Sequence, residues 1–270
     1  MQRLTVGCKT MADLFFLTEL AERTRGIAPG VRLAHPFLIE PIEGRDAVAR
    51  SLSAAQIALD MALQASAWIR SETAAAIAWR CGLSACEIEG VTLALLDGEG
   101  RIGEVRIAVR PVQRLEGWRE RLQPWLANQP KARALSLEGL DVSDARDAID
   151  TALPVHRRPP FPLSDDVAFH GPAFTRPVRG LNEVSHVLAH AGAGYGECED
   201  GLAMRSGTLF LRAFRSKALP LEIVSIARLD ADDRIVEWTA FMQPWPSMIV
   251  FRDRLRARLA GYLDDSFYER

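Results

Sequence analysis

The sequence predicts an α+β protein of two cone-shaped domains, each a curved antiparallel sheet wrapped around helices. Three observations predict this fold. The chain repeats itself at a nearly constant offset, each repeat contains stretches with helical periodicity, and each continues with alternating apolar stretches joined by tight turns. Helices followed by a run of antiparallel strands are typical of α+β domains, because the sheet buries its apolar face against the helices.

The repeat is clearest in the stretches that begin at Asp97 and Asp230. They read DGEGRIGEVRIAVRPVQRLEGWRERL and DADDRIVEWTAFMQPWPSMIVFRDRL, and eight of their 26 positions are identical at an offset of 133. Average composition gives roughly one or two identities by chance. An upstream block repeats at an offset of 136, and it pairs Pro36, Pro41, Gly44, Val48 and Leu52 with Pro172, Pro177, Gly180, Val184 and Leu188. The chain is therefore expected to be a tandem duplication.

The domain boundary is expected where the repeat is interrupted. We predict a first domain over residues 1–127, a linker over residues 128–165 and a second domain over residues 166–270. The run PVHRRPPFP at 154–162 holds enough proline to prevent a helix or a central strand. A short helix over 143–153 is expected before it, because Ser143 and Asp144 suit a helix start.

The elements of the first copy follow from periodicity and turn residues. Apolar residues at helical spacing predict helices, and the alternation around Val105 and Ile107 predicts a half-buried strand after the turn Asp97-Gly98-Glu99-Gly100. The expected elements are a helix over 11–24, a long helix from Gly44 to Gln64, extended stretches over 66–80, 85–96 and 101–110, and a helix over 114–126.

The second copy is expected to repeat this order. Gly192-Ala193-Gly194-Tyr195-Gly196 follows a helix and enters a strand, which is the reverse of a phosphate loop, so the run is expected to end the helix. The expected elements are a helix over 181–191, strands across 195–215, 219–229 and 234–243, and a helix over 246–263.

Composition excludes several classes of function. The formal net charge is −2 and the pI is about 6.2, so a global basic surface for nucleic acid is not expected. Apolar runs of the length that a membrane helix needs are missing, and the N-terminal apolar stretch is interrupted by Asp13 and Glu19. We therefore expect a cytoplasmic protein that does not bind membranes, whose cysteines are reduced and structural.

The motifs resemble a known family. HPFLIEPIEGRDAV at 35–48 and LLDGEGRIGEVRIAVRP at 95–111 resemble the SnoaL-like branch of the nuclear transport factor 2-like superfamily. GPAFTRPVRGLNEV at 171–184 and ARLDADDRIVEWTAFMQP at 227–244 resemble it more weakly. The resemblance implies a deep apolar pocket at the open end of each cone. The superfamily includes cyclases, isomerases and dehydratases as well as proteins without chemistry, so the fold alone does not fix the function.

The last strand of each copy departs from the catalytic members of that family. Many of them carry an aspartate there, whereas no carboxylate stands between Glu104 and Pro111 or between Glu237 and Pro244. A carboxylate in an apolar pocket is what supplies a general acid or base of useful pKa. Its loss from both copies argues against hydrolase and isomerase chemistry.

Four residues are candidates for chemistry, each with a structural alternative. His35 and His170 stand beside the matched prolines, at the expected mouth of each cone, where an imidazole could act as a base. The alternative, which the sequence favours, is that they are half-exposed loop histidines. Glu89 and its counterpart Glu222 could do acid–base work, but a structural ion-pair ladder with neighbouring arginines explains them better.

The ligand-binding candidates are mostly aromatic. Strand aromatics either fill a core or line a pocket, and spacing cannot separate the two. The candidates are Trp68, Trp79, Tyr195, Trp238 and, as an anion partner, Arg110. No cofactor and no metal are expected, because His186 and His190 share a helix face without a third ligand or a neighbouring glutamate.

The sequence thus predicts a small-molecule-binding protein with an apolar pocket and no catalysis. The alternative is a SnoaL-like cyclase, dehydratase or isomerase that acts on a hydrophobic small molecule. A ligand-binding role predicts a cavity above roughly 300 Å³ in one domain. The two domains are expected to form an intramolecular pseudo-dimer through their sheet faces, which leaves a homodimer of whole chains optional.

Overall fold

The computed structural model describes residues 14–59, 63–82, 87–129 and 160–269. We call the described residues up to 129 the first half and those from 160 the second half. The expected helix over 143–153, most of the Pro-rich run at 154–162 and the first residues of the expected helix over 11–24 lie outside the described residues.

The first half begins with a short helical segment and then alternates helices with strands. Helix α2 buries Val48, Leu52, Ala55 and Leu59 on one face, which is the stripe that its sequence predicts. The elements are η1 (Leu14–Phe16), α1 (Leu17–Glu22), β1 (Ile27–Ala34), β2 (Ile42–Glu43), α2 (Arg45–Leu59), β3 (Gln64–Arg70), β4 (Ala74–Cys81), β5 (Ile88–Leu96), β6 (Ile102–Arg110), η2 (Val112–Arg114) and α3 (Leu115–Leu126).

The second half has the same order from its first strand onward. The elements are β7 (Leu163–His170), β8 (Val178–Arg179), α4 (Leu181–Tyr195), β9 (Cys198–Ser206), β10 (Leu209–Ser216), β11 (Glu222–Leu229), β12 (Ile235–Gln243), α5 (Trp245–Arg258) and η5 (Asp265–Phe267).

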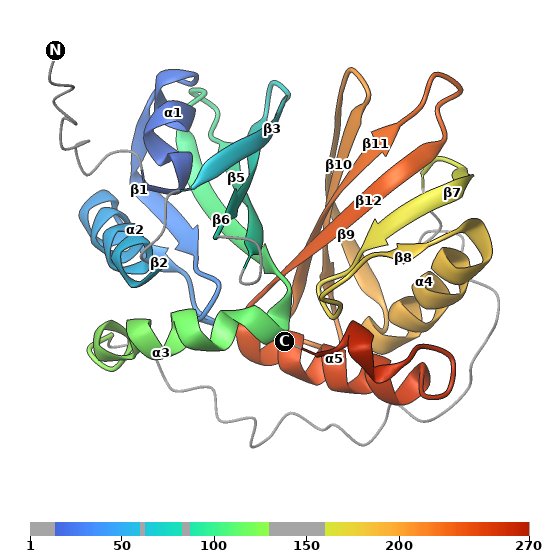
Figure 1. Ribbon diagram of the computed structural model, residues 1–270. Helices are drawn as coiled ribbons and strands as arrows, with labels where there is room; N and C mark the ends of the chain where they lie inside the picture. Colours follow the sequence, from blue (N-terminus) through green and yellow to red (C-terminus); the bar gives the residue numbers. More distant parts are fainter. Residues whose placement is uncertain (1–13, 60–62, 83–86, 130–159, 270) are drawn as a thin grey trace, which may run out of the picture.

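The strands form one open sheet with helices over each half, which confirms the expected α+β fold (Figure 1). Its strand order is β3-β4-β5-β6-β12-β11-β10-β9, and all pairs along this path are antiparallel. Strand β1 adds to β6 and β7 adds to β12, both in parallel, a pairing that the sequence analysis did not anticipate. Apolar side chains of the sheet and helices form the main core.

Two expectations about the strands are wrong in the same way. The stretches 66–80 and 195–215 each contain a hairpin, β3–β4 and β9–β10, where one extended stretch was expected. The first hairpin turns at Ser71, whose hydroxyl accepts hydrogen bonds from the N–H groups of Thr73 and Ala74 at 3.3 and 3.1 Å. A serine turn without glycine or proline is a weak sequence signal.

Helix α4 is longer than expected because it continues through the glycine run. It ends at Tyr195, and Gly196 follows with a φ of 68°. A Cβ at Gly194 would lie 3.3 Å from the Phe251 ring of α5, so close packing between the two helices explains a glycine there. Tyr195 therefore projects from a helix end and not from a strand.

The repeated motifs have equivalent conformations in the two halves. Asp97 Oδ1 accepts the N–H groups of Glu99 and Arg101, and Asp230 Oδ1 accepts those of Asp232 and Arg234, all at 2.8 to 2.9 Å. Gly44 and Gly180 precede the long helices with φ values of 92° and 91°, which only glycine adopts easily.

The contacts between the halves are reciprocal. Val109 of β6 pairs with Met242 of β12, which is its own counterpart at the offset of 133. The Val112 N–H donates to Pro172 O at 2.9 Å, and the Trp245 N–H donates to Pro36 O at 2.7 Å. A second apolar cluster joins the outer sheet faces, with Ile69, Val91 and Leu93 from the first half and Met204, Val224 and Phe241 from the second.

Within the described part of the chain, none of the helices is both long enough and apolar enough to cross a bilayer.

Candidate functional site

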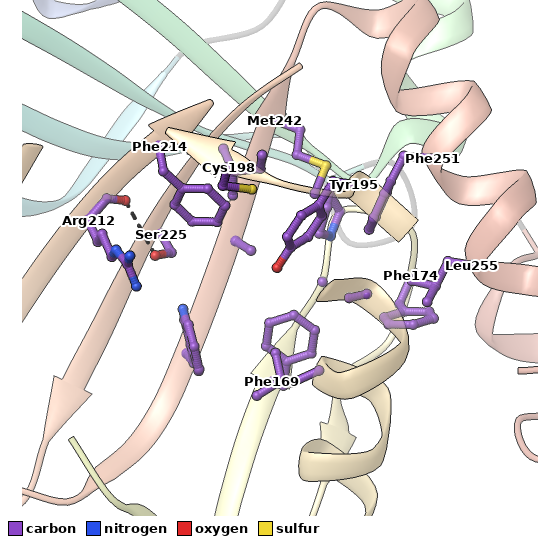
Figure 2. Close-up of a pocket in the computed structure, with 17 residues that line it drawn as sticks. Phe169, Phe174, Tyr195, Cys198, Arg212, Phe214, Ser225, Met242, Phe251 and Leu255 are labelled. Atoms are coloured by element: carbon purple, nitrogen blue, oxygen red, sulfur yellow. Dashed lines mark hydrogen bonds between the residues drawn. The ribbon is translucent and has the colours of Figure 1, made fainter. Parts of the chain in front are cut away.

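A cavity lies inside the second half, between its sheet and its two helices (Figure 2). Every long element of this half contributes a side chain to it. The lining residues are Phe169, Gly171, Pro172, Phe174, Leu188, Ala191, Tyr195, Cys198, Arg212, Phe214, Ile223, Ser225, Trp238, Ala240, Met242, Phe251 and Leu255. Its volume is about 50 Å³, which falls short of the roughly 300 Å³ that the sequence analysis expected of a ligand-binding pocket.

Aromatic rings dominate the cavity wall. Tyr195 stacks on Phe251 with ring centroids 5.7 Å apart and meets Phe214 edge-on at 5.8 Å. Phe169 meets Trp238 edge-on at 6.0 Å. Three of these lining rings, Tyr195, Phe214 and Trp238, are only half-buried.

Arg212 and Ser225 lie together at one side of the cavity. Figure 2 shows Arg212 and Ser225 on one side, with Phe174 and Leu255 on the other. The Arg212 guanidinium donates to the Asp200 carboxylate on β9, and its Cζ lies 5.4 Å from the Phe214 ring centroid. The Ser225 hydroxyl donates to Arg212 O at 3.4 Å. The cavity therefore has one cationic end and one apolar end.

The same region of the first half is filled. Strand register makes Trp79 the counterpart of Phe214, because Trp79 faces Gly90 and Phe214 faces Ile223 across equivalent strands. The Trp79 ring takes the space of the missing side chain, since a Cβ at Gly90 would lie 2.2 Å from it. Trp79 is 1% exposed, and its indole N–H donates to the Thr92 hydroxyl at 3.0 Å.

Further aromatic rings pack around Trp79 and fill the interior of the first half. Phe15 lies 5.4 Å from Trp79 and 6.0 Å from Trp118, and Phe37 meets Trp118 edge-on at 4.9 Å. Trp79 is thus a core residue, whereas the two second-half aromatics singled out from the sequence, Tyr195 and Trp238, line the cavity. Trp68 is half-buried on β3 under the Arg23 guanidinium, 4.0 Å away, and does not border the cavity.

His35 is fully buried and not at the mouth of a cone. Its Nδ1 accepts the Phe37 N–H at 3.2 Å, and its ring lies 5.4 Å from that of Trp125. Burial lowers the pKa of His35 to about 3. The side chain is neutral near pH 7 and packs as part of the core.

The remaining first-half candidates meet the second half at one cluster, which we call the Glu89 cluster (Glu89, Arg110, His170 and Glu237). Arg110 donates to the Glu89 carboxylate and, at 3.3 and 3.4 Å, to Phe174 O and Gly171 O. His170 Nε2 lies 3.3 Å from Glu237 Oε1. Burial lowers the pKa of His170, Arg110 lowers it further, and Glu237 raises it.

Glu222 belongs to the counterpart of that arrangement, the Glu222 cluster (Glu104, Arg106, Arg215, Glu222 and Gln243). Arg106 of the first half donates to the Glu222 carboxylate, and Gln243 Nε2 donates to its other oxygen at 2.8 Å. This cluster borders a second cavity of about 250 Å³ between the halves. Neither cluster touches the aromatic cavity through its carboxylates, which agrees with the ion-pair interpretation of Glu89 and Glu222.

Arg212 and Ser225 are the site residues that sequence reasoning missed. The offset of 133 does not hold across β4 and β10, so the repeat did not align Arg212 with its counterpart. The register of β4 and β10 follows an offset of 135, which aligns Arg212 with Ile77, whereas Ser225 aligns with Thr92 at the offset of 133. Among the described residues, no group of three or more side chains has the composition of a metal site.

Comparison with known proteins gives partial structural similarity. No protein-family model matches the chain, and no curated protein matches it in sequence. Solved structures match about two fifths of it. An uncharacterised protein with a cystatin-like fold from Silicibacter pomeroyi is 24% identical, with 39% of this chain and 77% of that chain covered and a TM-score of 0.36.

Two further structures carry the names that the motifs suggested. A steroid delta-isomerase from Pseudomonas aeruginosa is 20% identical, with coverage of 41% and 80% and a TM-score of 0.35. A SnoaL-like protein from Jannaschia sp. CCS1 is 13% identical, with coverage of 37% and 79% and a TM-score of 0.29. The chain is similar to nuclear transport factor 2-like and SnoaL-like proteins, and these likenesses concern the fold alone.

Proposed function

We propose that the protein binds an apolar small molecule in the cavity of its second half and does not transform it. One observation carries the proposal. Two halves with the same order of elements differ inside, because the first is plugged by Trp79 and the second keeps a cavity at the corresponding place. Packing alone would favour filling both, since an empty apolar cavity costs stability.

The size of the cavity limits the ligand. An engineered apolar cavity of about 150 Å³ holds benzene, and this one has about 50 Å³. Binding of a ring-sized ligand therefore requires the half-buried lining rings of Tyr195, Phe214 and Trp238 to rotate. Rotation of half-exposed aromatic side chains is a small rearrangement of the kind common on binding.

The lining chemistry supports binding without catalysis. Among the described residues that line the cavity, the ionisable ones are Tyr195, Cys198 and Arg212, and none is a carboxylate or a histidine. Acid–base chemistry of the isomerase or cyclase kind needs a group that exchanges a proton near neutral pH.

The test copies the plug of the first half into the second. In Phe214→Trp/Ile223→Gly, the new indole should occupy the cavity as Trp79 occupies its own site beside Gly90. Binding of 2-methylnaphthalene, measured by tryptophan fluorescence, should be lost while thermal stability is kept. The matched control is Phe210→Trp on the same strand, outside the cavity, which should bind as the wild type does. Equal binding by the plugged variant and the control would contradict the proposal.

We also propose that the two halves are copies of one unit that act as an intramolecular pseudo-dimer. The reciprocal bonds to Pro36 O and Pro172 O and the shared apolar cluster between sheet faces support this. In a closed twofold interface, a contact from one residue to another is repeated in return by their equivalents, as these two bonds are. Light scattering should give a mass near the 29.9 kDa of one chain, and an obligate dimer of chains would argue against it.

A further inference from the structure

The charge inside the cavity indicates what kind of ligand it suits. Among the described lining residues, Arg212 is the one that carries a full charge at neutral pH. We propose that the ligand carries a carboxylate or a similar anionic group and that Arg212 binds it. This inference rests on the proposed function, since it concerns the same cavity.

In the first half, whose corresponding space is filled, an apolar residue occupies the position of Arg212. Arg212 faces Ser225 across β10 and β11, and its counterpart Ile77 faces Thr92 across β4 and β5. Ile77 is fully buried in the plugged half. A mostly buried guanidinium beside the Phe214 ring is costly to desolvate, so its presence only in the half with a cavity supports a binding role.

The ion pair between Arg212 and Asp200 is one that a ligand carboxylate can replace. Its partner Asp200 lies on the neighbouring strand β9, and the side chain of Asp200 is 65% exposed while that of Arg212 is 21% exposed. An ion pair with such an exposed partner contributes little stability, because water screens it. A ligand carboxylate inside the apolar cavity would meet the same guanidinium in drier surroundings, where the interaction is stronger.

The shape of the site supplies the rest of the ligand's description. Arg212 lies at one end and Phe174 and Leu255 lie at the other, with aromatic rings between them (Figure 2). Arginine binds carboxylates through two parallel hydrogen bonds, which orients a planar acid. The chemical class that fits is a flat aromatic or alicyclic carboxylic acid, with its anion at Arg212 and its apolar body between the rings.

Paired probes separate this inference from the proposed function. Wild-type protein is titrated at pH 7 with benzoate and benzamide and with 2-naphthoate and 2-naphthamide, which differ in charge but hardly in shape. The acids should bind about tenfold more tightly than the amides. If acid and amide bind equally, the anion inference is overturned and the proposed function stands. If no acid and no amide binds, the proposed function is overturned as well.

Variants then assign the preference to Arg212. Arg212→Ile, which carries the first-half residue, should bind acid and amide equally, and Arg212→Lys should keep part of the preference. Asp200→Asn removes the competing carboxylate and should tighten 2-naphthoate binding about two- to fivefold without changing amide binding. The control Arg205→Gln breaks a surface pair with Asp233 and should change neither. Unchanged or weaker acid binding by Asp200→Asn would overturn the inference.

Discussion

At the residue scale, His35 makes the fold sensitive to acid. The side chain is fully buried, and its pKa is lowered to about 3 by burial, whereas an unfolded histidine titrates near 6.5. The unfolded chain therefore binds one more proton than the folded chain between these two values. The stability contributed by neutral His35 is fully present above about pH 6.5 and is lost as the pH falls toward 3.

We predict that His35→Asn flattens this dependence. The wild type should lose about 2 kcal/mol of unfolding free energy through this group between pH 6.5 and 4.5, because the slope approaches about 1.36 kcal/mol per pH unit below the unfolded pKa. Urea unfolding at several pH values measures it. The variant should be less stable at pH 7.5 but should lose less stability on acidification than the wild type does. Parallel slopes for the two proteins would contradict the assignment.

At the scale of elements, strands β4 and β5 pair so that the Trp79 ring packs over Gly90. Trp79 and Gly90 face each other across this pair, and the second half solves the same position with Phe214 and Ile223. The large tryptophan ring faces a glycine, which has no side chain, and the smaller phenylalanine ring faces a branched isoleucine. Each pair fills its strand surface, so exchange of one member alone should clash or leave a void.

We predict that Gly90→Ala destabilises the protein by about 3 kcal/mol, because the new Cβ would lie 2.2 Å from the indole. Addition of Trp79→Phe should recover at least about 1 kcal/mol of that loss, a coupling that chemical denaturation of the double-mutant cycle measures. Gly98→Ala is the control, since nothing lies within 4 Å of its Cβ. Additive effects of the two substitutions would show that the ring and the glycine are not fitted to each other.

Sequence patterns predicted most elements but only part of this site. The turn at Asp97-Gly98-Glu99-Gly100 and the stripe of α2 are local, and local signals place helices and hairpins well. The hairpin at Ser71 and the continuation of α4 to Tyr195 depend on a side-chain hydroxyl and on close packing against Phe251, which have no periodicity. The roles of Trp79 and Arg212 depend on strand register, which a pairwise offset does not specify.

At the scale of the whole molecule, the two junctions between the halves differ in which half supplies the arginine beside the glutamate. In the Glu89 cluster, Arg110 of the same half neutralises Glu89, and the position of Arg106 is held by Thr239. In the Glu222 cluster, Gln243 holds the position of Arg110, and Arg106 reaches across from the first half. Buried Glu222 and half-buried Glu89 thus each have one close arginine, but from a different half, and Arg215 lies farther from Glu222 at 3.8 Å.

We predict that Arg106→Thr destabilises the protein by about 3–5 kcal/mol, because it removes the close partner of buried Glu222. Gln243→Arg should rescue much of this loss, since it recreates the arrangement of Glu89 with Arg110. Thermal unfolding of the single and double variants measures the effect. Arg228→Thr, which breaks an exposed pair with Glu237, is the control and should cost less than about 1 kcal/mol. A double variant less stable than Arg106→Thr would contradict this interpretation.

The central claim is that a ligand enters the second half and not the first. Methyl-labelled methionine NMR tests it most directly, because Met242 lines the cavity while Met204 lies in the apolar cluster that joins the outer faces of the two halves of the sheet. During titration with 2-naphthoate, the Met242 methyl signal, assigned by Met242→Leu, should shift and saturate at one ligand per chain while the Met204 signal stays in place. Ligand binding that leaves the Met242 signal unmoved would contradict the account.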